Sequence, residues 1–296
     1  MILKQNRYKR RPHWLKRKLP AGENYTEISR LLKDQNLHTV CKSAHCPNVG
    51  DCWARRTATF MILGDSCTRN CLFCAIDHGH VHSLDAEEPL RVARAVKQLD
   101  LSYAVITSVT RDDLPDGGAL QFARTIEQIR ELQPRCRIEV LIPDLQGDPR
   151  ALDIIFKSHP DVLNHNLETV ERLYEKVRPQ ANFERSLKVI HLAKSAGLTT
   201  KSGMMLGIGE KDDEIIKAIQ SLLNAGCDIL TLGQYLQPSK DQVEVDRFVP
   251  PEQFDRLKKM GLELGFRHVE SGPFVRSSYH ADEQLLPDAD SAVQQK

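Results

Sequence analysis

The sequence lacks the features that mark membrane, secreted and nucleic-acid-binding proteins. Its 296 residues contain no apolar run approaching the roughly 18 residues that cross a bilayer. They also contain no apolar segment of the kind found in a secretory signal. The formal net charge is only +1, so the molecule as a whole has no strong attraction for nucleic acid or an anionic membrane. We therefore expect a cytoplasmic globular protein that binds neither nucleic acid nor a membrane.

Acidic residues are absent from the first 22 positions, where basic residues gather. Such a run is ordinarily a solvated terminal arm, and the other interpretation is a docking surface for an acidic protein or a phosphate-rich partner. A transit peptide would be basic as well but rich in serine, and the first serine here is Ser29. The basic residues are Lys4, Arg7, Lys9, Arg10, Arg11, Lys16, Arg17 and Lys18.

The eight cysteines do not fit a disulfide framework, because no secretory signal accompanies them. Six of them fall between positions 41 and 74. Clustered thiols in a reducing compartment typically bind metal or carry out redox chemistry. The other two, Cys136 and Cys227, stand alone at the starts of apolar runs and are predicted to be core thiols.

Short apolar runs alternate with amphipathic helical patterns from about residue 57 onward, which predicts a parallel sheet with helical crossovers. About six such units suit a partial (β/α)6 barrel of the TIM type. We expect N- and C-terminal extensions (1–55 and 271–296) to cover the mouth of a barrel over 56–270, at the strand ends where chemistry collects. The expected strands are 57–63, 103–108, 137–142, 161–166, 199–206 and 229–235, with 267–270 as a possible last one.

Cys67, Cys71 and Cys74 follow the first expected strand at spacings of i, i+4 and i+7. One apolar stripe of a buried helix would have the same spacing, but the flanking residues 64–66 and 68–70 favour turns. A zinc site usually takes four ligands from paired cysteines. Three thiolates can instead hold three irons of a cubane cluster and leave the fourth iron open for a cofactor.

With Phe73 before its last cysteine, this motif resembles the signature of the radical S-adenosylmethionine superfamily. The resemblance implies a 4Fe–4S cluster on the three cysteines, which would be both metal-binding and catalytic. S-adenosylmethionine would chelate the open iron and be cleaved to a 5′-deoxyadenosyl radical that removes hydrogen from an unactivated C–H bond. The residues expected to bind this cofactor are Phe73, Ser108, Asn164, Asn166, Glu168, Gly207 and Gly209.

Two further polar residues near the expected strand ends allow more than one interpretation. Arg178 could receive a carboxylate through its guanidinium or form an exposed salt bridge. His165 is predicted to satisfy a hydrogen bond at the barrel rim.

Cys41, Cys46 and Cys52 form a second triplet, whose spacings fit neither zinc fingers nor ferredoxin runs. Beside the radical motif, a second cluster is a better interpretation than a structural role. The triplet resembles that of the lipoyl synthase family, which also carries an Arg-Ser-Ser-Tyr motif, present here at 276–279. The resemblance covers roughly residues 11–281 and includes segments 12–16, 48–53, 107–118, 164–169, 177–179, 201–210 and 234–238.

This family resemblance implies that Ser278 is the fourth ligand of an auxiliary 4Fe–4S cluster. Because iron–sulfur clusters prefer soft thiolates, an alkoxide ligand suggests a cluster that is built to be taken apart. The implied enzyme is a sulfurtransferase of lipoate biosynthesis. It would insert two sulfur atoms at C6 and C8 of a protein-bound N6-octanoyl-lysine, with the auxiliary cluster as sulfur donor.

The implied partners are octanoylated lipoyl carrier domains, namely the acyltransferase subunit of 2-oxoacid dehydrogenases and the glycine-cleavage H protein. A low-potential electron donor such as ferredoxin or flavodoxin would also be needed. Carrier domains of this kind are often acidic, which would give the basic arm a docking role. The alternative functions are another radical sulfur-inserting enzyme, a two-cluster electron-transfer protein, and a zinc-containing nucleic-acid module.

Overall fold

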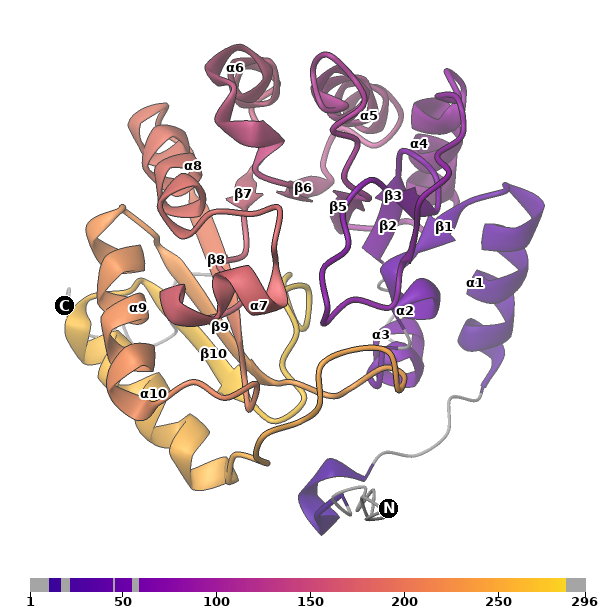
Figure 1. Cartoon of the computed structure of the whole chain (residues 1–296). Helices are drawn as coiled ribbons and strands as arrows, with labels where there is room; N and C mark the ends of the chain where they lie inside the picture. Colours follow the sequence, from indigo (N-terminus) through magenta and orange to yellow (C-terminus); the bar gives the residue numbers. More distant parts are fainter. Residues whose placement is uncertain (1–10, 17–21, 45, 55–58, 286–296) are drawn as a thin grey trace, which may run out of the picture.

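An open sheet of eight strands forms the centre of the computed structural model, which describes residues 11–16, 22–44, 46–54 and 59–285. The strand order is β1-β2-β5-β6-β7-β8-β9-β10, and every pair from β2 to β10 is parallel. Within these residue ranges β1 and β10 do not pair with each other, so the sheet does not close into a barrel. It curves into an open horseshoe (Figure 1). The strands are β1 His38–Thr39, β2 Thr59–Ile62, β5 Tyr103–Ser108, β6 Arg137–Leu141, β7 Val162–Asn164, β8 Thr200–Leu206, β9 Ile229–Gln234 and β10 His268–Gly272.

Helices connect the parallel strands and lie around the outside of the horseshoe (Figure 1). Along β5, Ala104 and Ile106 are completely buried in the core beneath these helices, whereas Tyr103 and Val105 face inward, because side chains alternate along a strand. The connecting helices are α4 Glu88–Gln98, α5 Ala119–Leu132, α6 Pro149–Lys157, α8 Phe183–Ser195, α9 Asp212–Asn224 and α10 Pro251–Leu264. The shorter elements are η1 His13–Leu15, β3 Ser66–Cys67, β4 Asp77–His78, η2 Leu145–Gly147, η3 Glu171–Leu173 and α7 Tyr174–Val177.

The structure confirms the predicted partial barrel and each of its expected parallel strands. The possible last strand is present as β10, which pairs with β9. The antiparallel edge strand β1 was not predicted, because its two residues are too few to produce a periodic signal. Cys136 and Cys227 are buried at the starts of β6 and β9, as expected for core thiols. Among the described residues, no helix combines the length and apolarity of a membrane span.

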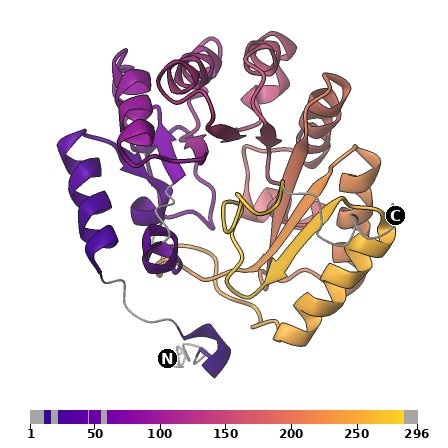
Figure 2. The ribbon, with the colours of Figure 1, turned by 180° about the vertical axis from the view of Figure 1, so that it is seen from behind.

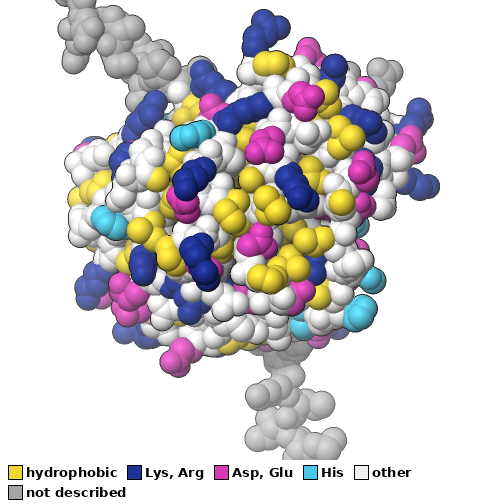
Figure 3. Space-filling view, turned by 90° about the horizontal axis from the view of Figure 1, so that it is seen from above, with side chains coloured by type: hydrophobic (Ala, Val, Ile, Leu, Met, Phe, Trp, Pro, Cys, Tyr) yellow, Lys and Arg dark blue, Asp and Glu magenta, His cyan; other side chains and the backbone are white. Residues whose placement is uncertain are grey.

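The N-terminal region packs against the first edge of the sheet through α1 Glu23–Asp34, α2 Val40–Ser43 and α3 Val49–Ala54. Ile28 of α1 and Trp53 of α3 are completely buried in the same core as Phe60 of β2. Most of the predicted basic arm lies outside the described residues. Figure 3 shows Lys and Arg side chains interspersed with Asp and Glu on the side where α5 and α6 lie, so this face carries no patch of a single sign.

The lumen of the horseshoe contains a fully buried ion pair. Lys201 of β8 lies 3.0 Å from the Glu139 carboxylate of β6, and neither side chain is exposed. Tyr103 and Asn164 donate to the same carboxylate at 2.8 and 2.9 Å. All the polar atoms of the carboxylate thus have partners, which offsets the cost of removing it from water.

Replacing Lys201 by Met should destabilise the protein strongly, because the Glu139 charge would remain buried without its cation. The expected loss in the free energy of unfolding is about 3–5 kcal/mol, measured by urea denaturation of the cluster-loaded protein. The double variant Lys201→Met/Glu139→Gln should recover part of this loss. A loss below about 1 kcal/mol for Lys201→Met, as for an exposed ion pair, would contradict the expectation.

Candidate functional site

The loop after β2 carries Cys67, Cys71 and Cys74 on turns and extended backbone, not on a helix. The helical-stripe alternative is therefore excluded. The backbone N–H groups of Arg69 and Thr110 donate to the Cys67 sulfur at 3.4 and 3.3 Å. Such N–H···S contacts are a common way for proteins to tune a cluster thiolate.

The donor set of this loop fits an iron–sulfur cluster. Burial raises the pKa of Cys71, and burial together with the neighbouring cysteines raises that of Cys74 to about 12. Three thiolates this close together need a compensating positive charge, which cluster iron would supply. In the described part of the chain, no three His, Cys, Asp or Glu side chains converge as they would around one metal ion. A cubane has a different requirement, because each thiolate binds its own iron at a separate corner.

Arg69, inside the cysteine motif, fastens this loop to the two following strand ends. Its guanidinium donates twice to Asp112, at 2.6 and 2.9 Å, and once to the fully buried Asp144 at 2.6 Å. Burial alone would raise the pKa of Asp144, but the hydrogen bond and charge of Arg69 outweigh it and lower that pKa to about 2. Arg69 was not among the residues predicted from the sequence, although its place between two cysteines of the motif is a usable signal.

The second cysteine triplet meets Ser278 in one pocket. Cys41, Cys46, Cys52 and Ser278 line it together, although more than 200 residues separate the serine from the triplet. Thr59, the first residue of β2, donates to Ser278 Oγ at 2.8 Å. Burial, followed by the nearby Cys46, raises the pKa of Cys41 to about 11, so this site too would need a metal to hold its thiols deprotonated.

Two other hydrogen bonds join the N- and C-terminal segments around this pocket. Asn48 Nδ2 donates to the Phe274 carbonyl at 2.7 Å, and the Tyr279 hydroxyl donates to Asp51 at 3.1 Å. Figure 2 shows the chain after β10 turning back into the middle of the horseshoe. These contacts hold the Arg-Ser-Ser-Tyr motif against the cysteine triplet.

This pocket lies toward the starts of the strands. The pocket is lined by Thr59 and Tyr103, the first residues of β2 and β5. The Cys67 loop, in contrast, follows the end of β2. Because the sheet is open, its lumen has room for the C-terminal segment, and Ala281 packs there against Tyr103 and Val105.

The lumen-side candidates for cofactor binding have polar atoms that remain available. Ser108 Oγ, Asn164 Oδ1 and Asn166 Oδ1 are buried and have no hydrogen-bond partner among the residues that the structure describes. Burial raises the pKa of Glu168, whose φ of +68° is costly for a residue other than glycine. Unsatisfied buried polar atoms and local strain are typical of a ligand site.

The other three candidates have different surroundings. Phe73 is partly buried and packs against the apolar core around β8 and β9. The backbone N–H groups of Gly207 and Gly209 donate to the Glu210 carboxylate at 2.6 and 3.1 Å. A side chain at Gly207 would collide with the Arg247 carbonyl, 2.3 Å from an added Cβ. The local backbone structure is thus sufficient to explain why glycine occupies position 207. Contact of Gly207 and Gly209 with a cofactor stays a prediction.

Arg178 and His165 lie close to the cysteine loop. Arg178 is only 8% exposed and donates to the carbonyls of Asn166 and Leu167 at 3.1 Å, so an exposed salt bridge is excluded. Its positive charge lowers the pKa of Cys71, opposing the effect of burial. His165 Nδ1 donates to the Ile142 carbonyl at 2.9 Å, as predicted.

The burial of His165 predicts a pH-dependent stability. Burial, together with the Arg178 charge, lowers the pKa of His165 from 6.5 to about 4. Unfolding therefore takes up a proton between about pH 6.5 and pH 4, and the free energy of unfolding falls as the pH drops through this window. The slope from this ring is at most about 1.4 kcal/mol per pH unit. His165→Asn keeps a donor near the Nδ1 position and should show a flatter pH profile in urea denaturation; equal slopes would contradict the prediction.

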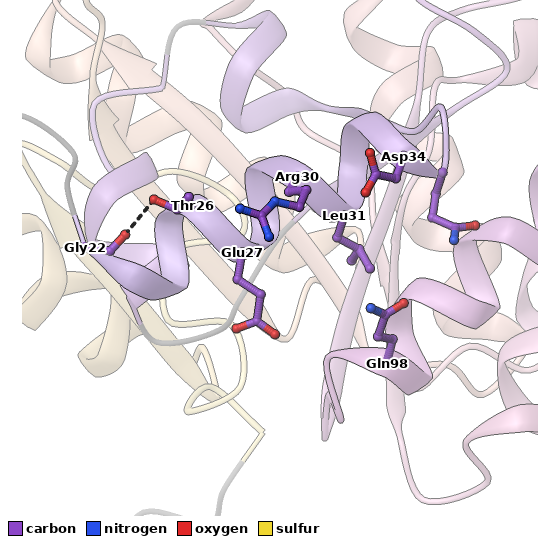
Figure 4. Close-up of a pocket in the computed structure, with 8 residues that line it drawn as sticks. Gly22, Thr26, Glu27, Arg30, Leu31, Asp34 and Gln98 are labelled. Atoms are coloured by element: carbon purple, nitrogen blue, oxygen red, sulfur yellow. Dashed lines mark hydrogen bonds between the residues drawn. The ribbon is translucent and has the colours of Figure 1, made fainter.

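A larger hollow of about 670 Å³ lies on the outer surface, away from the cysteines. Figure 4 shows its lining along α1, with Glu27, Arg30 and Asp34 on the helix and Gln98 from the end of α4. Its open, mixed-charge surface contains no cysteine and no strand end. The chemistry therefore belongs to the two cysteine sites.

Two family models match the chain. The model of the Radical SAM superfamily matches residues 61–222, and that of the N-terminal domain of lipoyl synthase of the radical SAM family matches residues 1–46. A lipoyl synthase of Rubrobacter xylanophilus is 55% identical over 276 residues, 93% of this chain and 86% of that protein. One of Roseiflexus is 54% identical over 92% of this chain and 91% of that protein. A mitochondrial lipoyl synthase of Nematostella vectensis is 51% identical over 93% and 95%.

Solved structures of distant sequence have a similar fold. SuiB of Streptococcus suis, bound to S-adenosylmethionine, has a TM-score of 0.56 at 12% identity over 73% of this chain and 50% of SuiB. HydG, a maturase of the [FeFe]-hydrogenase, has a TM-score of 0.54 at 14% identity over 88% and 63%. The chain therefore spans about half the length of SuiB. At this identity the similarity supports the fold alone.

Proposed function

The chain belongs to the lipoyl synthase family of radical S-adenosylmethionine enzymes. We propose that one of its two cysteine sites generates the radical and that the other supplies the sulfur. The enzyme is a sulfurtransferase of lipoate biosynthesis that uses S-adenosylmethionine and two 4Fe–4S clusters. It inserts sulfur at C6 and C8 of an octanoyl group held on a lipoyl carrier protein.

Cys67, Cys71 and Cys74 would hold the radical-generating cluster. When bound, this cluster would supply the electron that cleaves S-adenosylmethionine to a 5′-deoxyadenosyl radical, and the auxiliary cluster would supply the sulfur that enters the octanoyl chain. At the first site, the role of the protein is to hold the cysteine loop in place and to stabilise the negative charge on its thiolates. Arg69 ties the loop to Asp112 and Asp144, and the N–H groups of Arg69 and Thr110 point at the Cys67 sulfur.

Cys41, Cys46, Cys52 and Ser278 would hold the auxiliary cluster. The observation that carries this assignment is their presence in one pocket, with Ser278 brought in by the C-terminal segment. An oxygen ligand is the weakest of the four for iron, so this corner is the natural place for the cluster to open. Ser108, Asn164, Asn166, Glu168, Phe73, Gly207 and Gly209 remain the proposed cofactor contacts, and the first three offer unpartnered polar atoms.

The finer assignments of partner and location are part of the proposal. The carriers would be the acyltransferase subunit of 2-oxoacid dehydrogenases and the glycine-cleavage H protein, with ferredoxin or flavodoxin as electron donor. We also propose a division into an N-terminal extension 1–55, a barrel 56–270 and a C-terminal extension 271–296. The proposed location is the cytoplasm, which cell fractionation would distinguish from the mitochondrial location in the name of the Nematostella relative.

The proposal can be tested with an octanoyl-lysine peptide, S-adenosylmethionine and a reductant under anaerobic conditions. The expected products are 5′-deoxyadenosine and a peptide whose mass has increased by two sulfur atoms. Formation of neither would favour an electron-transfer protein, and purified protein containing zinc without iron would favour the zinc module.

A further inference from the structure

Two neighbouring serines of the C-terminal segment reach two different walls of the lumen. Ser277 Oγ accepts a hydrogen bond of 2.6 Å from Asn166 Nδ2, and Ser278 Oγ accepts one of 2.8 Å from Thr59 Oγ1. Asn166 follows β7, whereas Thr59 begins β2, and strands β5 and β6 lie between them in the sheet. One peptide bond therefore connects the proposed cofactor contacts to the proposed auxiliary site.

Asn166 is held so that one end of its amide stays available. Its Nδ2 donates to Ser277 and, at 3.0 Å, to Glu168. Its Oδ1 is buried and has no partner among the described residues. Gly203 leaves room for this arrangement, because an added Cβ there would lie 3.0 Å from Asn166 Oδ1 and 2.4 Å from Thr231 Oγ1. An unpartnered buried acceptor costs about 1–3 kcal/mol, which a donor group on a bound molecule would relieve.

We propose that Ser277 is a positioning residue that couples occupancy of the cofactor site at Asn166 to the retention of Ser278 by the auxiliary cluster. This inference rests on the proposed function, which assigns those two sites. A donor that bonds to Asn166 Oδ1 polarises the amide and strengthens its N–H···O bond to Ser277, since linked hydrogen bonds reinforce one another. A firmly held Ser277 restricts the adjoining backbone and keeps the Ser278 oxygen on its iron.

This coupling gives Ser278 a timing role. While intact S-adenosylmethionine is bound, the serine-held iron is retained. Once a first cofactor is cleaved and its fragments leave, Asn166 would lose its ligand and the constraint on Ser277 would weaken. The auxiliary cluster would then be easier to open in the interval between the two cofactor cleavages, after the first sulfur has been transferred.

The test measures iron loss from the auxiliary cluster in the absence of turnover. Protein with both clusters loaded is mixed anaerobically with a ferrous-iron chelator, without reductant, with and without S-adenosylmethionine. We expect the cofactor to slow loss of the serine-held iron about fivefold in the wild type and in Ser277→Thr, which keeps the hydroxyl. In Ser277→Ala the rate should be the same with and without cofactor. Mössbauer spectra of ⁵⁷Fe-loaded samples should change on cofactor addition only where the hydroxyl is present.

Ser271→Ala is the matched control. Its hydroxyl is buried and donates to the Phe254 carbonyl at 2.8 Å, away from both sites, so this variant should behave as the wild type does. If Ser277→Ala cannot be loaded, Ser277→Val replaces it, since valine has the shape of threonine without the hydroxyl. A cofactor effect that persists without the hydroxyl, or is absent in the wild type, would overturn the coupling. Failure of the proposed function looks different, because Ser278→Ala would then lose iron no faster than the wild type without cofactor.

Discussion

Ser278→Ala should stop formation of the lipoyl product while the enzyme continues to cleave S-adenosylmethionine. The serine lies in the pocket of Cys41, Cys46 and Cys52, far along the chain from the Cys67 loop and outside its hydrogen-bond network. Its loss should remove an auxiliary iron ligand and leave the radical site intact. The measurement is an octanoyl-peptide assay in which 5′-deoxyadenosine and sulfur-containing peptide are quantified in the same samples.

Cys46→Ala provides the companion variant, because it removes a different ligand of the same site. Both variants should give 5′-deoxyadenosine without product, whereas Ser271→Ala should give both. Product at full yield per protein from either Ser278→Ala or Cys46→Ala would contradict the assignment of the auxiliary ligands.

Cys71→Ala should have a different effect, namely loss of both 5′-deoxyadenosine and product. This thiol is one of three in the loop after β2, and the five other cysteines either line the second pocket or are buried at the starts of β6 and β9. Iron bound per chain should fall by about half, because the auxiliary site keeps its own ligands. Iron analysis and the same peptide assay measure the two effects together.

Cys227→Ala is the control for this second prediction. Its thiol is buried at the start of β9, and its sulfur donates to the Ile229 carbonyl at 3.2 Å. The variant should lose some stability from the small cavity but bind the full amount of iron and remain active. Cofactor cleavage by Cys71→Ala at the wild-type rate would show that the radical site lies elsewhere.

Most of the parallel strands could be predicted from the sequence because they are buried on both faces and appear as largely apolar runs. The residues from Ala104 to Ile106 and from Ile229 to Leu232 are such runs, and both form strands. The two-residue β1 carries no pattern of this kind. Its place is decided by pairing with Phe60 and Met61 of β2, which is a tertiary contact.

The candidate site was predictable only in part. The spacing of Cys67, Cys71 and Cys74 contains chemical information, whereas Ser278 carries no signal of its own and was assigned only through the family resemblance. The bonds of Arg69 to Asp112 and of Asn166 to Ser277 depend on which loops meet in the folded chain. Local sequence pattern does not contain that information.

The auxiliary cluster of this chain should be the source of both inserted sulfur atoms. The most direct measurement loads the protein with ³⁴S-labelled clusters, removes free sulfide, and runs a single turnover with octanoyl peptide in the presence of unlabelled sulfide. Mass spectrometry of the product should then find ³⁴S at both inserted positions. Unlabelled sulfur in the product, with the labelled clusters still intact on the protein, would contradict the claim.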